Sequence, residues 1–239
     1  MKSFFEFLKN LFAALFPPTG PLIDTTKEQK VEPKKDAVID LSKDETKELK
    51  KIKVPANINL IELKPYYKQL LEQCLLNHDS LNQISKDCAS VFLYKEKYKS
   101  VEKYTGVPWY VVGAIHLKEA SQNFAKNLHN GQPWNQITTT VPKGVVPFQS
   151  WEAAAIDALK SAKGFHFDDI ETCLYFCERH NGFGYMLHKP ILSPYLWCGT
   201  NLYSKGGYVT DGVYDSNYVI KNTGCVPIIL RFNEFRHIA

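Results

Sequence analysis

One carboxylate, Glu119, closes an almost entirely apolar run of the sequence that starts at Trp109. Burial among apolar neighbours raises the pKa of a carboxyl group, because the charged form loses its hydration. A Glu that holds its proton near neutral pH can deliver it to the oxygen of a glycosidic bond. The sequence therefore indicates Glu119 as a general acid. The competing interpretation is a surface Glu on the polar face of a helix, beside Lys118.

His116 precedes Glu119 by three residues, so the two side chains share one face of a helix. The pair is half of a zinc-binding His-Glu-x-x-His type of helix, but the second His at the required spacing is absent. We therefore predict no metal site and no cofactor. His116 is interpreted as a side chain that supports Glu119, or as a hydrogen-bonded histidine of the core.

Polar and aromatic residues farther along the chain could bind the substrate. Asn181 and Tyr185 could hydrogen-bond sugar hydroxyl or acetamide groups, and the glycines between them leave room for a sugar chain. Alternatively, Asn181 and Gly182 only end a helix. Glu178 lies one turn earlier, where a cleft position and a surface position are both open.

Two aromatic residues and a threonine complete the candidate site. Tyr195 and Trp197 offer flat rings suited to the apolar face of a pyranose, although aromatic residues in such a run are commonly core residues. Thr138 lies in a loop rich in Gly, Pro and Thr, where it could border the cleft or be an ordinary polar loop residue.

These runs resemble the lysozyme-like superfamily, in particular lytic transglycosylases and goose-type lysozymes. In those enzymes a catalytic Glu in a Glu-Ser pair ends an apolar helix, and a Tyr-Asn-Ala-Gly-like turn lines the sugar cleft. Here Ala120 replaces the Ser, and His180 replaces the Tyr before Asn181. The Gly-Leu-Met-Gln motif of transglycosylases is missing.

A closer resemblance, over nearly all of residues 95–232, is to phage and bacterial lysozyme-type proteins. Four runs carry it in the expected order: Ile115-His116-x-x-Glu119, Leu128-His129-Asn130-Gly131, Glu-x-x-Asn-Gly-x-Gly-Tyr over residues 178–185, and Ser193-Pro194-Tyr195-Leu196-Trp197. The resemblance implies a glycosidase of the cell envelope, or one associated with a phage. Its partner would be the glycan strands of peptidoglycan.

The implied reaction cleaves the β-1,4 bond between N-acetylmuramic acid and N-acetylglucosamine. After protonation by Glu119, either water or the muramic 6-hydroxyl would capture the oxocarbenium-like state. A hydrolase needs a second carboxylate, for which the sequence offers Glu178, Asp157, Asp211 and Asp215. A transglycosylase needs only one.

Two other classes of function stay open at this point. One is a wall-binding module that keeps the fold and has lost catalysis, and the other is a metal-dependent peptidase that acts on the stem peptides. The formal net charge of +4 is too small to indicate nucleic acid as a partner.

The elements that must position these residues are mainly α-helical. Apolar periodicity, capping residues and prolines predict helices after Pro65, from Leu81 to Phe92, from Pro108 to Phe124, from Ser150 towards Gly164, from Asp168 to Asn181, and from Pro227 onward. Gly206 and Gly207 suggest a short hairpin over residues 203–208. We expect a lysozyme-like helical domain with a small hairpin and long loops.

The domain is predicted to span residues 57–239, behind two different leading segments. Residues 17–56 are rich in Lys, Asp, Glu, Thr and Pro and predict a flexible charged linker. Residues 1–16 are apolar with flanking lysines and predict an amphipathic segment that touches a membrane surface or a protein. No stretch of the sequence reaches the roughly twenty apolar residues of a membrane span.

Overall fold

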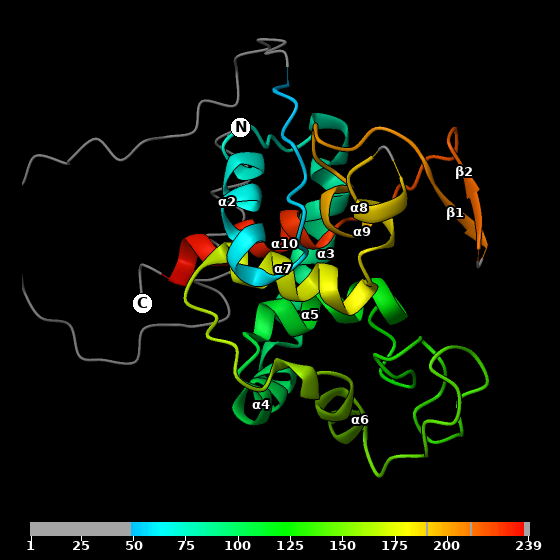
Figure 1. The fold of residues 1–239 in the computed structure, drawn as a ribbon. Coiled ribbons are helices and arrows are strands. Elements are labelled where there is room, and N and C mark those ends of the chain that lie inside the picture. Colours follow the sequence, from blue (N-terminus) through cyan, green and yellow to red (C-terminus); the bar gives the residue numbers. More distant parts are fainter. Residues whose placement is uncertain (1–48, 190, 211, 237–239) are drawn as a thin grey trace, which may run out of the picture. The chain divides into compact units, whose positions relative to one another are not determined.

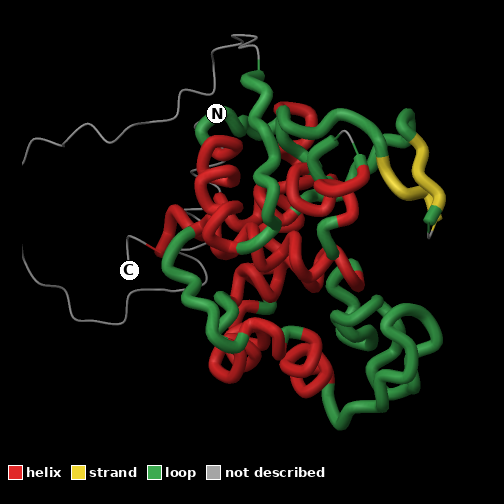
Figure 2. The backbone as a smooth tube through the Cα atoms, viewed as in Figure 1, coloured by secondary structure: helices red, strands yellow, loops and turns green. Residues whose placement is uncertain are grey.

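The structure is a computed structural model that describes residues 49–189, 191–210 and 212–236. Within them lie nine α-helices and one two-stranded sheet, so the fold is mainly α, as predicted (Figures 1 and 2). The elements are α2 (Leu60–Leu71), α3 (Leu81–Leu93), α4 (Lys95–Thr105), α5 (Trp109–Ala120), α6 (Trp151–Ala158), α7 (Ile170–Asn181), α8 (Gly184–His188), α9 (Pro194–Trp197), β1 (Gly207–Thr210), β2 (Val213–Asp215) and α10 (Cys225–Arg236).

Helix α5 is the central helix of these residues. Every residue from Tyr110 to His116 is buried, and a helix that is apolar on all sides must be covered on all sides. Helices α3, α4, α7 and α10 pack against it (Figure 1). A Cβ atom at Gly113 would collide with Val91 of α3, so this glycine permits the close approach of the two helices. Glu119 is thus carried by a helix whose position is fixed from several sides.

The start of α5 is marked in the sequence, but its end is not, because the helix stops at Ala120 and not at the predicted Phe124. Pro108 precedes the helix, as predicted, and Gly106 ends α4 with a left-handed φ of 73°. After Ala120 the chain turns at once, because Ser121 and Gln122 adopt positive φ angles of 49° and 59°. This conformation costs roughly 1–2 kcal/mol for each L-residue other than glycine. The strained turn therefore lies directly behind Glu119, where stored strain commonly accompanies a functional site.

Helix α7 carries the second group of candidate residues. Its N-cap is Asp169, whose Oδ1 accepts from the Thr172 amide at 2.8 Å, one residue later than the predicted start at Asp168. Asp169 also pairs with Lys64 at 2.6 Å and so ties α7 to α2. The helix ends at Asn181, before Gly182, as predicted. Its residues from Thr172 to Glu178 are all buried.

The hairpin exists, but its position differs from the prediction. β1 pairs with β2 in antiparallel register, with Gly207 opposite Asp215 and Thr210 opposite Val213, so the strands are joined beyond Thr210 and not at Gly206 and Gly207. Gly206 and Gly207 lie at the start of the first strand instead. A Cβ atom at Gly206 would collide with the Tyr214 hydroxyl, so this glycine serves close packing rather than a turn.

A long segment that forms no helix or strand, residues 121–149, joins α5 to α6. Residues 121–149 form loops on one side of the helices, and the hairpin lies on the same side (Figure 2). The loops and the hairpin flank the region where α5 ends.

The compact part of the chain begins before residue 57. The Lys50 amide donates to the Gln73 side chain at 2.9 Å, and the Gln73 side chain returns a bond to the Lys50 carbonyl at 3.1 Å. Ile52 and Val54 pack against the core. Residues 49–56, assigned above to the linker, are therefore part of the domain. The predicted segment 1–16 and the first part of the predicted linker lie outside the described residues.

No helix in the described part of the chain combines the length and the apolar character that crossing a bilayer requires.

Candidate active site

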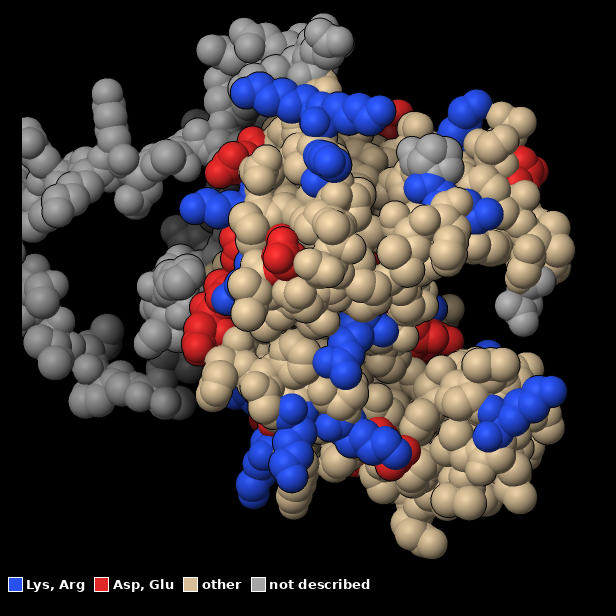
Figure 3. All heavy atoms as spheres, viewed as in Figure 1, with Lys and Arg blue, Asp and Glu red and all other residues tan. Residues whose placement is uncertain are grey.

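Glu119 is the penultimate residue of α5, and its side chain is 19% exposed. It is therefore largely desolvated and still reachable from solvent. Figure 3 shows the molecule hollowed between the hairpin and the 121–149 segment, with acidic atoms at the back of the hollow. We call Glu119 and its neighbours Lys118, His180 and Tyr195 the Glu119 site.

Tyr195 holds one oxygen of the Glu119 carboxyl group. Its hydroxyl donates to Glu119 Oε1 at 2.9 Å. A neutral carboxyl group carries a single proton, and Oε1 already accepts one from the tyrosine. The proton that Glu119 can give away therefore resides on Oε2.

Burial shifts the Glu119 carboxyl group towards its protonated form. Burial raises its pKa to about 7, and the Tyr195 hydrogen bond and the charge of Lys118 lower it less than burial raises it. Lys118 itself donates to the Asn222 Oδ1 atom at 2.6 Å, and its Nζ lies 5.6 Å from the centre of the Tyr195 ring. Burial lowers the pKa of Lys118. The site therefore combines a carboxyl group of raised pKa with a lysine beside it.

His180 approaches the same carboxyl group without forming an ion pair. Its Nε2 lies 3.8 Å from Glu119 Oε1 and 2.9 Å from the Leu128 carbonyl oxygen. Because a carbonyl can only accept, Nε2 carries a proton that it donates to Leu128. Burial lowers the pKa of His180, which favours the neutral ring. A neutral His180 leaves the raised pKa of Glu119 undisturbed.

The run of residues 128–131 lies against Glu119 from the backbone side. A Cβ atom at Gly131 would collide with the main-chain carbonyl oxygen of Glu119, and this residue has a φ of 72°. The run is held by Asn127, whose Oδ1 accepts from the amides of His129 at 2.9 Å and Asn130 at 3.1 Å. Two runs far apart in the sequence, 128–131 and 180–181, thus meet at the end of α5.

His116 belongs to the core. It is fully buried, its Nδ1 lies 3.0 Å from the Tyr98 hydroxyl, and its ring packs against Phe124 and Trp151 with ring centres 4.6 and 4.8 Å apart. Burial lowers its pKa to about 4. Of the two interpretations of His116, this placement matches the core histidine, because its ring is enclosed by other aromatic residues.

Asn181 and Tyr185 have different surroundings in the structure. Asn181 is exposed at the end of α7, next to His180, so its side chain is available to a ligand. Tyr185 is 7% exposed, and its hydroxyl accepts from the Tyr208 amide at 3.2 Å. Tyr185 therefore attaches the hairpin to α8, and its hydroxyl acts as the acceptor of that bond.

Thr138 and Trp197 do not present their side chains to a substrate. The Thr138 hydroxyl donates to the Pro142 carbonyl at 2.6 Å and accepts from the Val145 amide at 3.0 Å. It stabilises its own loop. Trp197 is completely buried in the core, which leaves its ring no open face for a sugar. Tyr195, by contrast, contacts Glu119 through its hydroxyl rather than through its ring face.

Glu178 lies in a different cavity from Glu119. This cavity, of about 670 Å³, is formed by residues 49–54, α2, α7 and the segment from Met186 to Leu202, and Glu119 does not line it. Glu178 is therefore poorly placed as the second carboxylate of a glycosidase.

The other carboxylates proposed from the sequence have partners of their own or are not described. Asp157 bonds to His129 at 2.9 Å and to Lys160 at 3.0 Å. Asp215 is exposed on β2 and accepts from the Asn217 amide at 2.8 Å. Asp211 lies outside the described residues.

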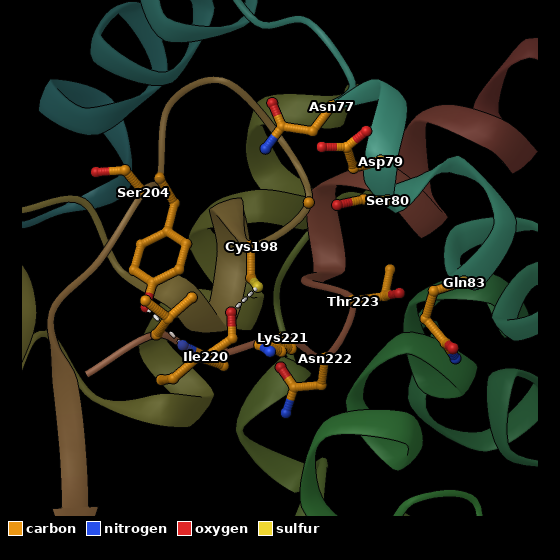
Figure 4. Close-up of a pocket in the computed structure, with 13 residues that line it drawn as sticks. Asn77, Asp79, Ser80, Gln83, Cys198, Ser204, Ile220, Lys221, Asn222 and Thr223 are labelled. Carbon is orange, nitrogen blue, oxygen red and sulfur yellow. Dashed lines mark hydrogen bonds between the residues drawn. The ribbon is translucent and has the colours of Figure 1, made fainter. Parts of the chain in front are cut away.

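A second cavity, of about 280 Å³, lies beside the start of α3 (Figure 4). The labelled side chains include Asn77, Asp79, Cys198 and Asn222, and the Cys198 thiol donates to the Ile220 carbonyl at 3.0 Å. Asn222 links this cavity to Lys118. No buried side-chain polar atom that lacks a partner among the described residues lines it.

Two residues of the Glu119 site were not predicted as site residues. The sequence interpretation has Lys118 only as a neighbour of Glu119 on a polar helix face. A lysine directly before a buried Glu could have indicated a charge that stabilises the carboxylate. The resemblance has His180 at the position of the Tyr in the Tyr-Asn-Ala-Gly-like turn, and this position could have indicated it as a site residue. Lys118 is the neighbour of Glu119 in the sequence, whereas the approach of His180 depends on the contact between α5 and α7, which neither local sequence contains.

Within the part of the chain that the structure describes, no group of three or more His, Cys, Asp or Glu side chains is placed to hold a metal ion. Comparison of the chain with family models, with curated proteins and with solved structures gives no match.

Proposed function

We propose that this protein cleaves the β-1,4 bond between N-acetylmuramic acid and N-acetylglucosamine in peptidoglycan, with Glu119 as the general acid. The observation that carries the proposal is the state of Glu119. It is a carboxyl group with a pKa raised to about 7, partly exposed at the end of a buried helix, with its Oε1 held by Tyr195. The lysozyme-like resemblance of the four runs supports the same reaction.

In the proposed reaction, Glu119 Oε2 gives its proton to the glycosidic oxygen while the bond from that oxygen to C1 of the muramic sugar breaks. Glu119 is then a carboxylate, stabilised by the Tyr195 hydroxyl and the nearby charge of Lys118. The same carboxylate takes a proton from the group that attacks C1, which restores the acid.

We further propose that the attacking group is the muramic 6-hydroxyl. A hydrolase with two carboxylates would need a second one at the site, and Glu178, Asp157 and Asp215 are all placed or engaged elsewhere. The route with a single carboxylate therefore fits the described residues better. Its products are anhydro-muropeptides.

The test is incubation of purified cell wall with the full chain, followed by separation of the products by mass. We expect anhydro-muropeptides from the wild type. Glu119→Gln keeps the shape of the side chain without the proton donor, so it should lower the rate by at least about a hundredfold. Glu72→Gln is the matched control, since Glu72 is exposed just after α2.

Each alternative has its own signature in the same experiment. Reducing muropeptides would indicate hydrolysis by water, and free stem peptides would indicate a peptidase. Co-sedimentation with the wall without any product would indicate a binding module. A Glu119→Gln variant that keeps its native circular dichroism and more than about a tenth of the rate would exclude Glu119 as the acid.

A further inference from the structure

The Glu178 cavity, the space of about 670 Å³ described above, has the size of a small-molecule site. Figure 1 shows residues 49–54 crossing between α2 and the α8–α9 region, and these residues form one wall. The other walls come from α2, α7 and residues within 186–189 and 191–202. The cavity is thus enclosed by parts of the chain that are far apart in sequence.

Two buried polar atoms at this cavity have no hydrogen-bond partner among the described residues. They are Glu178 Oε1 and the Tyr67 hydroxyl, on residues that are 2% and 0% exposed. Both residues line the cavity. Buried polar atoms are normally satisfied by protein, water or a ligand, so an unpaired pair that borders one cavity offers hydrogen bonds that a ligand can take in place of water.

The hydrogen-bonding direction of these two atoms follows from their neighbours. The Ser193 hydroxyl accepts from the Tyr195 amide at 3.3 Å, so its own proton is free for its hydrogen bond to Glu178. One Glu178 oxygen is therefore an acceptor, and in the neutral acid the proton lies on the unpaired Oε1. Burial raises the pKa of Glu178 to about 8, which favours the neutral acid. Glu178 and Tyr67 then both offer O–H donors.

The rest of the lining of the Glu178 cavity disfavours cationic ligands. Most of the remaining side chains are apolar, and the charged ones are lysines. The apolar lining includes Ile52, Val54, Leu70, Met186, Ile191, Leu192 and Leu202, and the lysines are Lys50, Lys51, Lys53 and Lys189. Lys51 and Lys53 are exposed, so positive charge lies at the solvent side. A cationic ligand would be repelled there, and an anionic group would be attracted.

We propose that the Glu178 cavity binds a small apolar amide with a free carboxylate, such as an N-acylated apolar dipeptide. Its carbonyl oxygen accepts from Glu178 and Tyr67, its apolar side chains lie on the apolar walls, and its carboxylate faces the lysines. This site is separate from the Glu119 site, and the proposal does not depend on glycan cleavage.

The test is isothermal titration of the full chain with N-acetyl-leucyl-leucine. Tyr67→Phe should weaken binding by about tenfold, the loss expected for one hydrogen bond. Glu178→Gln should bind within about threefold of the wild type, because its amide still donates, whereas Glu178→Leu should weaken binding by tenfold or more. The thermal midpoint of each variant shows whether it has folded.

Two further probes test the orientation of the ligand. N-acetyl-leucyl-leucinamide lacks the carboxylate and should bind more weakly than the acid. The double substitution Lys51→Gln and Lys53→Gln should remove that difference. Glu119→Gln should leave the titration unchanged, and Tyr67→Phe should leave the release of muropeptides unchanged, so failure at one site is distinguishable from failure at the other.

Three results would overturn the proposal. They are no measurable heat with the acid, equal binding by the Glu178→Gln and Glu178→Leu variants, or tighter binding of leucyl-leucinamide, whose free amine is cationic.

Discussion

At the scale of single residues, the chemistry of the Glu119 site depends on two opposing effects on one carboxyl group. Burial favours the protonated form, and the Tyr195 hydroxyl and the Lys118 charge favour the ionised form. Burial has the larger effect, so the pKa of Glu119 is raised to about 7. Tyr195 and Lys118 are still placed to stabilise the Glu119 carboxylate when the proton leaves. His180 adds no charge to this balance as long as it is neutral.

Tyr195→Phe tests this balance. The cleavage rate of the wild type should fall as pH rises through about 7, because the acid form of Glu119 is lost. Removing the hydroxyl removes a bond that favours the carboxylate, so the falling limb should move to higher pH by on the order of one unit. The measurement is the pH profile of muropeptide release. Tyr104→Phe, on an exposed tyrosine, is the control, and an unmoved limb in Tyr195→Phe would contradict the assigned bond.

At the scale of elements, the position of Glu119 is decided by the end of α5 and the loop that follows it. The helix is buried along its length, the chain reverses at Ser121 and Gln122, and residues 128–131 return to the Glu119 main chain. The His180 bond to the Leu128 carbonyl then joins this loop to the end of α7. The site is therefore an assembly of two helix ends and one loop.

Gly131→Ala tests that assembly, and Gly144→Ala is its matched control. Both glycines lie in the same segment with similar φ angles, 72° and 78°, but only a Cβ atom at Gly131 meets the Glu119 carbonyl. Gly144→Ala should cost about 1 kcal/mol of unfolding free energy from the backbone alone. Gly131→Ala should cost more and should also reduce cleavage by tenfold or more, since a small misplacement of an acid is expensive. Equal effects of the two substitutions on unfolding and on rate would show that the contact with Glu119 is unimportant.

At the scale of the whole molecule, buried glutamates and buried histidines make the free energy of unfolding depend on pH. Glu119 and Glu178 have pKa values raised by burial to about 7 and about 8, so they hold protons in the folded state that they lose in the unfolded chain. Their contribution to stability is lost progressively as pH rises from about 4.5, the ordinary value for Glu, up to those values. His116 and His180 have lowered pKa values, so their contribution is lost as pH falls below about 6.5, the ordinary value for His. The two trends oppose each other in mild acid, and of these four groups only the two glutamates act above neutrality.

We therefore expect the unfolding free energy to fall between pH 6.5 and pH 8.5, measured by urea titration. For Glu178 alone the loss should be about 2 kcal/mol by pH 8, from about 1.4 kcal/mol per pH unit. Glu178→Gln should flatten this part of the curve, and Glu72→Gln should not. A slope that Glu178→Gln leaves unchanged would mean that Glu178 is ionised throughout this range.

Truncation tests the revised boundary of the domain. Deleting residues 1–48 should leave the thermal midpoint nearly unchanged, because the described core is built from later residues. Deleting residues 1–56 should lower it by several degrees, since the Lys50–Gln73 bonds and the packing of Ile52 and Val54 are lost. Equal midpoints for the two truncations would show that residues 49–56 do not stabilise the domain.

The sequence by itself determined the features that depend on short-range rules. The helical class, the start of α5 after Pro108, the end of α4 at Gly106, the Ser150 cap of α6 and the end of α7 at Asn181 follow from propensities, caps and apolar periodicity. The burial of α5 followed from its unbroken apolar run, and with it the raised pKa of Glu119. The hairpin was misplaced because two adjacent glycines signal a turn and a close packing contact equally well.

Only the tertiary structure decided which residues share a site. Tyr195 reaches Glu119 across 76 positions of sequence, and His180 reaches Leu128 across 52. Glu178 and His180 lie two residues apart on α7, so they point to different sides of the helix, one to the Glu178 cavity and one to the Glu119 site. The same alternation on α9 puts Trp197 in the core and Tyr195 against Glu119. Periodicity indicates that such neighbours diverge, but only the packing of other elements against α7 and α9 decides what each one meets.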